Sequence, residues 1–271
     1  MSTTKKLLTA RLDDGTEVYC LRVPEAVVLD SHVEGYMGNG IDIKDGDVVF
    51  DIGANIGLLG VRACQRFPNT KVFAFEPIPD IFNAAKANAD KFGKGNYTVI
   101  PLGVSDAEGE LTFTYFPNAP ALSTSDPGQW DIDPSQFENA VKGNLENMPR
   151  RYRLLRYMPR FLMPLIARQI KSGSVTVNCK LTTVSKVMED HNIPKIDLLK
   201  VDCEGAELAV LKGIKQEHWP LIGKVVAEVH DVDGRLDTVT TLLKSHGFIN
   251  IHKEKEKGFE KTQLTNIFAT R

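Results

Sequence analysis

The sequence lacks the features that would place it in a membrane or in a disulfide-stabilised fold. Only four of its 271 residues are cysteines, and Cys20, Cys64, Cys179 and Cys203 form neither a CxxC pair nor a metal-binding spacing. Reduced thiols are therefore expected. The N-terminal residues contain no apolar signal core, and no apolar run approaches the length of a membrane span. We expect a cytoplasmic protein.

Strong charge of one sign and internal repeats are also absent. The 33 Lys and Arg residues nearly balance the 35 Asp and Glu residues, which gives a formal net charge of -2. This balance gives no reason to expect nucleic acid as a partner. We predict one domain over residues 1–271, in which residues 1–45 form an N-terminal prelude, the segment that precedes the alternation of strands and helices. Nothing in the sequence indicates an oligomeric state.

The sequence does contain an alternation of strand and helix patterns. Strand-like runs cover residues 45–53, 70–77, 96–106, 195–205 and 223–231. Helical spacing covers residues 56–67, 80–93, 206–214 and 235–247. Short β-α-β connections predict an α/β fold with a doubly wound, mostly parallel seven-stranded sheet and helices on both faces. Residues 249–271 predict a C-terminal antiparallel hairpin.

One long segment interrupts this alternation. After a strand predicted at 109–116, residues 117–174 are irregular and then basic. The basic second half, residues 148–173, contains no acid, and its cations are Arg150, Arg151, Arg153, Arg156, Arg160, Arg168 and Lys171. We predict a helical lid over the ligand cleft. Its cations fit a solvated face, a dock for an anionic carrier protein, or a membrane surface, and the last is the least favoured.

A glycine-containing turn begins at Asp51, after the first buried strand. Ligands of such sheets bind at the carboxyl ends of the strands. Gly53 allows a ligand to approach the backbone, and Glu76 at the end of the next strand suits a ribose diol. Asn55 stands where a dinucleotide fingerprint has its second glycine, and Asp51 adds a negative charge. The turn therefore favours a cationic amino-acid nucleoside over a pyrophosphate.

These motifs resemble those of the S-adenosylmethionine-dependent methyltransferases with a seven-stranded sheet, and within them the FkbM family. The stretches that carry the resemblance are DIGANIG (51–57), FEP (75–77), GVSD (103–106), DLLKVDCEGAE (197–207) and EVH (228–230). It extends from Val48 to the C-terminus apart from the insertion, which is similar to that of methyltransferases attached to polyketide or nonribosomal peptide synthases. The resemblance implies O-methylation of a natural-product hydroxyl, on a small molecule or a carrier-tethered acceptor.

The resemblance also implies which residues bind S-adenosylmethionine. The implied set is Glu34, Asp51, Gly53, Asn55, Gly57, Glu76, Ser105 and Asp106. Within it, Glu76 would bond to the ribose hydroxyls, and Ser105 and Asp106 would meet the adenine amino group. Glu34 would approach the amino group of the cofactor.

Transfer of a methyl group to a hydroxyl requires alignment of the two reactants and removal of a proton. Acids and a histidine stand at two predicted strand ends. Residues two apart in an extended strand point to the same side, so Glu228 and His230 are expected to face one pocket. We predict Asp202, Glu228 and His230 as the catalytic residues.

The same residues also allow other roles. The set Asp202, Glu204, Glu228 and His230 would also suit Mg²⁺. Asp202 and Glu204, which follow the fourth predicted strand, could instead cap the following helix, and His230 could bond to Asp231 or Asp233. For the whole protein, the alternatives are a sugar O-methyltransferase, an NAD-dependent oxidoreductase or epimerase, and a non-catalytic nucleoside-binding module. The glycine pattern argues against NAD, and the acids argue against a non-catalytic module.

Overall fold

The computed structural model describes residues 6–125, 139, 142, 163–255, 260 and 262–271. The predicted lid therefore lies partly outside the described residues. Its cations at Arg150, Arg151, Arg153, Arg156 and Arg160 are outside them, whereas Arg168 and Lys171 are within them.

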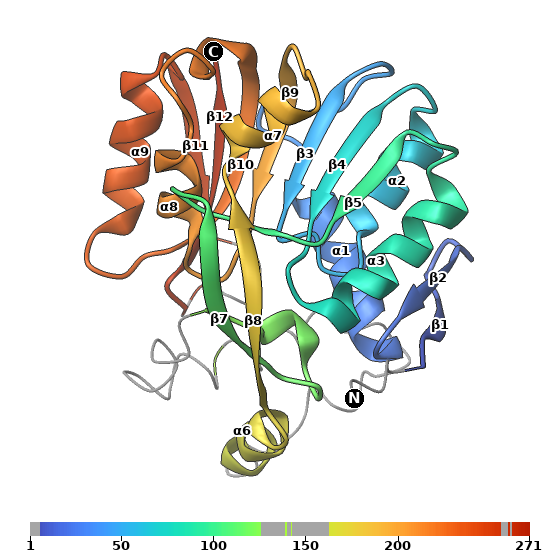
Figure 1. Ribbon diagram of the computed structural model, residues 1–271. Helices are drawn as coiled ribbons and strands as arrows, with labels where there is room; N and C mark the ends of the chain where they lie inside the picture. Colours follow the sequence, from blue (N-terminus) through green and yellow to red (C-terminus); the bar gives the residue numbers. More distant parts are fainter. Residues whose placement is uncertain (1–5, 126–138, 140–141, 143–162, 256–259, 261) are drawn as a thin grey trace.

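A seven-stranded sheet forms the centre of the structure, in the order β11-β12-β10-β9-β3-β4-β5 (Figure 1). Its strands are β3 (Val48–Ile52), β4 (Lys71–Phe75), β5 (Tyr97–Ile100), β9 (Ile196–Val201), β10 (Ile222–His230), β11 (Asn250–Glu254) and β12 (Leu264–Thr270). Strands β5, β4, β3, β9 and β10 are parallel, and β12 runs antiparallel to β10 and β11. The predicted mostly parallel sheet and C-terminal hairpin are confirmed.

Helices cover both faces of this sheet, each over its own apolar core (Figure 1). On one face lie α1 (Val23–Gly35), α2 (Leu58–Arg66) and α3 (Pro79–Phe92). On the other lie α7 (Val184–Asp190), α8 (Glu207–Lys212) and α9 (Arg235–Ser245). All five residues of β3 are buried between the two cores, as expected for a central parallel strand.

The prelude contains more structure than its sequence indicated. It forms a hairpin of β1 (Leu8–Arg11) and β2 (Glu17–Cys20) and the 13-residue helix α1. Of these elements, the alternation in EVYCLRV (17–23) predicts only the second strand. The apolar residues of α1 are spread around the helix and give no clear stripe, so the usual helical pattern is weak.

A second, smaller sheet lies beside the main one (Figure 1). It contains β6 (Gly103–Val104), β8 (Val175–Thr182) and β7 (Gly109–Tyr115). The run at 96–106, expected as one strand, is divided between β5 and β6. The turn η1 (Pro120–Leu122) and the helix α6 (Met163–Lys171) belong to the predicted insertion, and η4 (Trp219–Leu221) precedes β10. No helix among the described residues is both long and apolar enough to span a bilayer.

Candidate functional site

A cavity of about 500 Å³ lies at the carboxyl ends of the parallel strands. The strand-end floor is the group of lining residues that follow or end these strands: Gly53, Asn55, Glu76, Asp202, Cys203, Glu204 and Glu228. The helical wall is the group from α1 and the insertion: Arg22, Pro24, Glu25, Val28, Leu29, His32, residues 118–123, Ile166, Gln169 and Ile170. The carboxylates of the floor thus face a largely aliphatic wall across one cavity.

The glycine turn is shaped by contacts inside the protein. Gly53 has a φ of 71°, and a Cβ atom there would lie 1.8 Å from the carbonyl oxygen of Asp202. A Cβ atom on Gly57, with a φ of 81°, would lie 2.3 Å from the hydroxyl of Tyr97. Both positions therefore require glycine for close packing as well as for backbone geometry. Gly57 does not line the cavity but holds the start of α2 behind it.

Glu76 closes β4 and reaches the cavity with a fixed carboxyl group. Its two oxygens accept hydrogen bonds from the backbone N–H groups of Asn55 and Ile78, at 3.2 and 2.9 Å. The residue is only 5% exposed. Burial raises the pKa of Glu76 to about 8, although these two hydrogen bonds act in the opposite direction. This acid is held in place before any ligand binds.

Lys200, which the sequence left without a role, forms ion pairs with two acids. Its Nζ lies 3.1 Å from Asp51 Oδ1 and 3.5 Å from Asp202 Oδ2, and it donates to the carbonyl of Gly53. Burial alone would lower the pKa of Lys200, but the two acids outweigh burial and raise that pKa. The charge of Asp51, which is 1% exposed, is therefore matched by Lys200 and does not face the cavity.

Tyr36, just beyond α1, is a second residue that sequence reasoning missed. Its hydroxyl donates to Asp202 Oδ2 at 2.7 Å, and its ring lies 5.4 Å from Lys200 Nζ. Asp202 therefore receives both a hydrogen bond and an ion pair on the same oxygen. Only the unusual position of Lys200, inside an apolar strand, could have indicated this network from the sequence.

His230 lies between two acids behind the floor. Its Nε2 is 3.3 Å from Glu204 Oε2, and its Nδ1 is 3.6 Å from Glu207 Oε1. Burial alone would lower the pKa of His230, but the two carboxylates outweigh burial and raise it well above its ordinary value. Burial also raises the pKa of Glu204, against the opposing effect of His230. The two carboxylates on either side of the ring therefore favour the protonated form of the imidazole.

The surroundings of Glu204 distinguish between the alternative roles raised above. Glu204 has a φ of 51°, an uncommon backbone conformation for a residue other than glycine. Arg235 donates to the carbonyl of Gly205, and Gly205 donates to Glu207. Helix α8 begins after Ala206 with no side-chain cap, so neither Asp202 nor Glu204 caps it. The carboxylate of Asp231 accepts a hydrogen bond from the backbone N–H of Leu236 in the first turn of α9.

Besides Asp51 and Gly57, three further residues of the implied cofactor set lie outside the cavity lining: Glu34, Ser105 and Asp106. The exposed carboxylate of Glu34 accepts a hydrogen bond from Arg66 at 2.7 Å. Ser105 donates to Asp106 near Gly213, away from the strand-end floor. The predicted residues that the structure brings together on the floor are Gly53, Asn55, Glu76, Asp202, Glu204 and Glu228.

The acids do not form a metal centre. Within the part of the chain that the structure describes, no group of three or more His, Cys, Asp or Glu residues is placed to hold a metal ion. Three members of the set considered for Mg²⁺ are divided between two ion-paired groups: Asp202 is paired with Lys200, and Glu204 with His230. The geometry therefore gives no support to magnesium at this floor.

Comparisons with known proteins agree on one family. The family model described as "Methyltransferase FkbM domain" matches residues 51–249. The 31-O-demethyl-FK506 methyltransferase FkbM of Streptomyces tacrolimicus is 33% identical over 97% of this chain and 96% of its own length. The methyltransferase sdnD of Sordaria araneosa is 33% identical over 74% of this chain and 73% of its own. The AMB antimetabolite synthetase AmbE of Pseudomonas aeruginosa is 30% identical over 88% of this chain and 11% of its own.

Proposed function

Because this chain belongs to the FkbM family of S-adenosylmethionine-dependent methyltransferases, we propose that it methylates a hydroxyl group of a small molecule bound in the cavity. The name of the Streptomyces relative states that its substrate lacks a methyl group on an oxygen, which supports O-methylation here. The observation that carries the proposal is the position of Glu76 and Glu204 on the floor of one cavity, with His230 paired to Glu204 behind that floor.

The residues present fit S-adenosylmethionine, which supplies an electrophilic methyl group when bound. Glu76 would accept hydrogen bonds from the ribose hydroxyls, since its carboxyl lines the cavity and is held by two backbone N–H groups. The turn at Gly53 and Asn55 would hold the methionine part. Asp51 would act indirectly, because its ion pair with Lys200 keeps that turn against β9.

The hydroxyl of the acceptor must lose a proton during the transfer. We propose that Glu204 accepts this proton as the general base, because it lines the cavity and burial raises its pKa. His230 already carries a proton between Glu204 and Glu207, so it would orient Glu204 rather than act as the base. Asp202 is committed to Lys200 and Tyr36, and it would hold the turn in place. Glu228 also lines the floor, where we assign it to acceptor binding.

The helical wall supports an acceptor with an apolar body. Val28, Leu29, Leu122, Ile166 and Ile170 line this side of the cavity. Sugar hydroxyls placed against such side chains would lose their hydrogen bonds to water without replacement. This composition favours a natural-product acceptor over a sugar. The similarity to a segment of a synthetase also supports delivery of that acceptor on a carrier protein.

Thermal unfolding and a methyl-transfer assay test this function. S-adenosylhomocysteine at 100 times its dissociation constant should stabilise the protein by about 2.7 kcal/mol, whereas NAD should have no effect. Labelled S-adenosylmethionine should then transfer its methyl group to apolar alcohols and not to the matching amines. Stabilisation by NAD alone would indicate an oxidoreductase, and transfer to the amines alone would contradict O-methylation.

A further inference from the structure

Helix α1 forms part of the helical wall although it lies outside the segment that matches the family model. It contributes Glu25, Val28, Leu29 and His32 to the cavity. Its N-terminal end contacts the insertion, where Glu25 accepts a hydrogen bond from the backbone N–H of Ala121 at 2.8 Å. The place of this helix therefore sets the width of the cavity.

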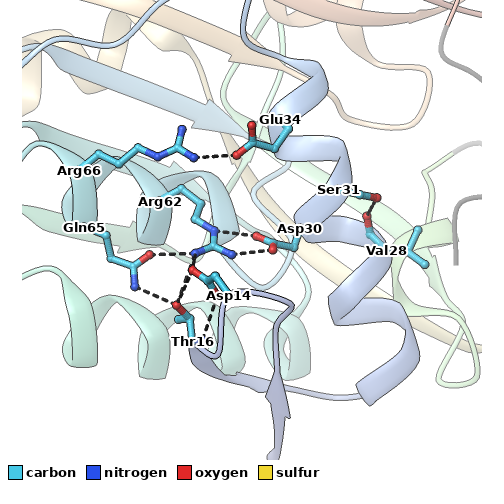
Figure 2. Close-up of polar contacts among 9 residues, drawn as sticks. All are labelled: Asp14, Thr16, Val28, Asp30, Ser31, Glu34, Arg62, Gln65 and Arg66. Atoms are coloured by element: carbon cyan, nitrogen blue, oxygen red, sulfur yellow. Dashed lines mark hydrogen bonds and ion pairs between the residues drawn. The ribbon is translucent and has the colours of Figure 1, made fainter. Parts of the chain in front are cut away.

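Arg62 on α2 holds the middle of α1 through a paired contact (Figure 2). Its Nε and Nη2 donate to the two carboxylate oxygens of Asp30, at 2.8 and 2.6 Å. Its Nη1 donates to Asp14 in the β1–β2 turn at 2.5 Å and is close to Gln65 and Thr16. One guanidinium group thus joins the hairpin, α1 and α2.

A second ion pair joins the same two helices and provides a comparison (Figure 2). Arg66 contacts Glu34 through one nitrogen and one oxygen at 2.7 Å. The side chains of that pair are 55% and 64% exposed, whereas those of Arg62 and Asp30 are 13% and 15% exposed. A paired contact shielded from water fixes geometry better than a single exposed one.

We propose that Arg62 is a positioning residue for the cofactor site. Helix α2 begins directly after the glycine turn, and α1 carries the side chains that face this turn across the cavity. The bidentate contact between Arg62 and Asp30 fixes these two helices relative to each other. It thereby fixes the distance between the helical wall and the strand-end floor. The inference rests on the proposed use of this cavity for S-adenosylmethionine.

Calorimetric binding of S-adenosylhomocysteine tests this role, at a temperature where circular dichroism shows each variant to be folded. Arg62→Gln should weaken binding by about tenfold, because a small displacement of a site wall is costly. Asp30→Asn removes the same contact from the other helix and should reproduce the loss. Arg62→Lys keeps the positive charge but cannot make the bidentate contact. Its affinity for S-adenosylhomocysteine should therefore fall between those of Arg62→Gln and the wild type. Arg66→Gln should remain within twofold.

The outcomes separate this inference from the proposed function. If the wild type does not bind S-adenosylhomocysteine, the proposed function fails and this inference with it. If the wild type binds, but Arg62→Gln and Asp30→Asn bind equally well despite lower melting temperatures, the contact is only structural. Should Arg62→Gln fail to fold, Asp30→Asn decides alone.

Discussion

The strand-end floor carries acids held by fixed partners, whereas the helical wall opposite presents mostly aliphatic side chains. On the floor, Asp202 is bound by Lys200 and Tyr36, and Glu204 is paired with His230. On the wall, Val28 and Ile170 lie on two helices distant in sequence. The floor can therefore hold its carboxylates at positions fixed by their hydrogen bonds and ion pairs. The wall can select the shape and polarity of a ligand.

The two regions also differ in how they tolerate change. A buried charge that loses its partner is strongly destabilising, so substitutions on the floor affect both the fold and the chemistry. Aliphatic contacts depend mainly on volume and accept similar side chains at small cost. We therefore expect variants of the floor to change turnover and cofactor affinity, and variants of the wall to change the choice of acceptor.

The largest expected effect is on the floor, at Glu204. Glu204→Gln removes the proposed proton acceptor and should lower kcat by about 10²–10⁴-fold, the usual contribution of a general base. The affinity for S-adenosylhomocysteine should stay within twofold of the wild type. Glu217→Gln, an exposed site, is the control. Turnover near the wild-type value in Glu204→Gln would assign the proton to another group, with Glu228 as the next to test.

Glu76 should give a smaller effect, confined to binding. Glu76→Ala should weaken S-adenosylhomocysteine binding by about 1–3 kcal/mol, the cost of leaving a buried hydrogen-bonding group without its partner. Isothermal calorimetry measures this change directly. Unchanged affinity would place the ribose elsewhere in the cavity.

The raised pKa of Glu76 also predicts a pH dependence of stability. In the fold this pKa is about 8, against an ordinary value of 4.5. The protonated carboxyl therefore stabilises the fold at low pH, and this contribution is lost as the pH rises from about 4.5 through 8. In Glu76→Gln this loss is absent, so the melting temperature of the wild type should fall relative to that of the variant over this range. If the melting temperatures of the two proteins change with pH in the same way, the raised pKa of Glu76 is contradicted.

The wall should give the smallest effect and only on the acceptor. Ile170→Asp places a charge against the apolar body of the acceptor and should raise its KM roughly tenfold, since burying such a side chain is worth about 1.5–3 kcal/mol. Leu165→Asp on the same helix is the matched control, because Leu165 is 62% exposed. A similar rise in both variants would mean that α6 does not contact the acceptor.

Much of the floor could be predicted because its residues stand at fixed places in a regular pattern. The β-α alternation determines a parallel sheet, and parallel strands bring their carboxyl ends to one edge. Glu76 and Asp202 follow such strands and Glu228 lies two residues before the end of one, so their position in the sequence was enough to place them on one cavity. Glu34 has no such position, and it lies on the surface with Arg66.

The sequence by itself determined the sheet, the hairpin and the acids at the strand ends, because local apolar periodicity and turn residues specify these features. Only the tertiary structure decided which groups pair with them. Tyr36 meets Asp202 across 166 residues, and Arg62 meets Asp30 across 32. Such pairs depend on which elements pack together, and no local pattern in the sequence records that choice. The same packing places His230 in an ion pair with Glu204. It also makes Lys200, an unusual residue inside an apolar strand, the partner of two acids.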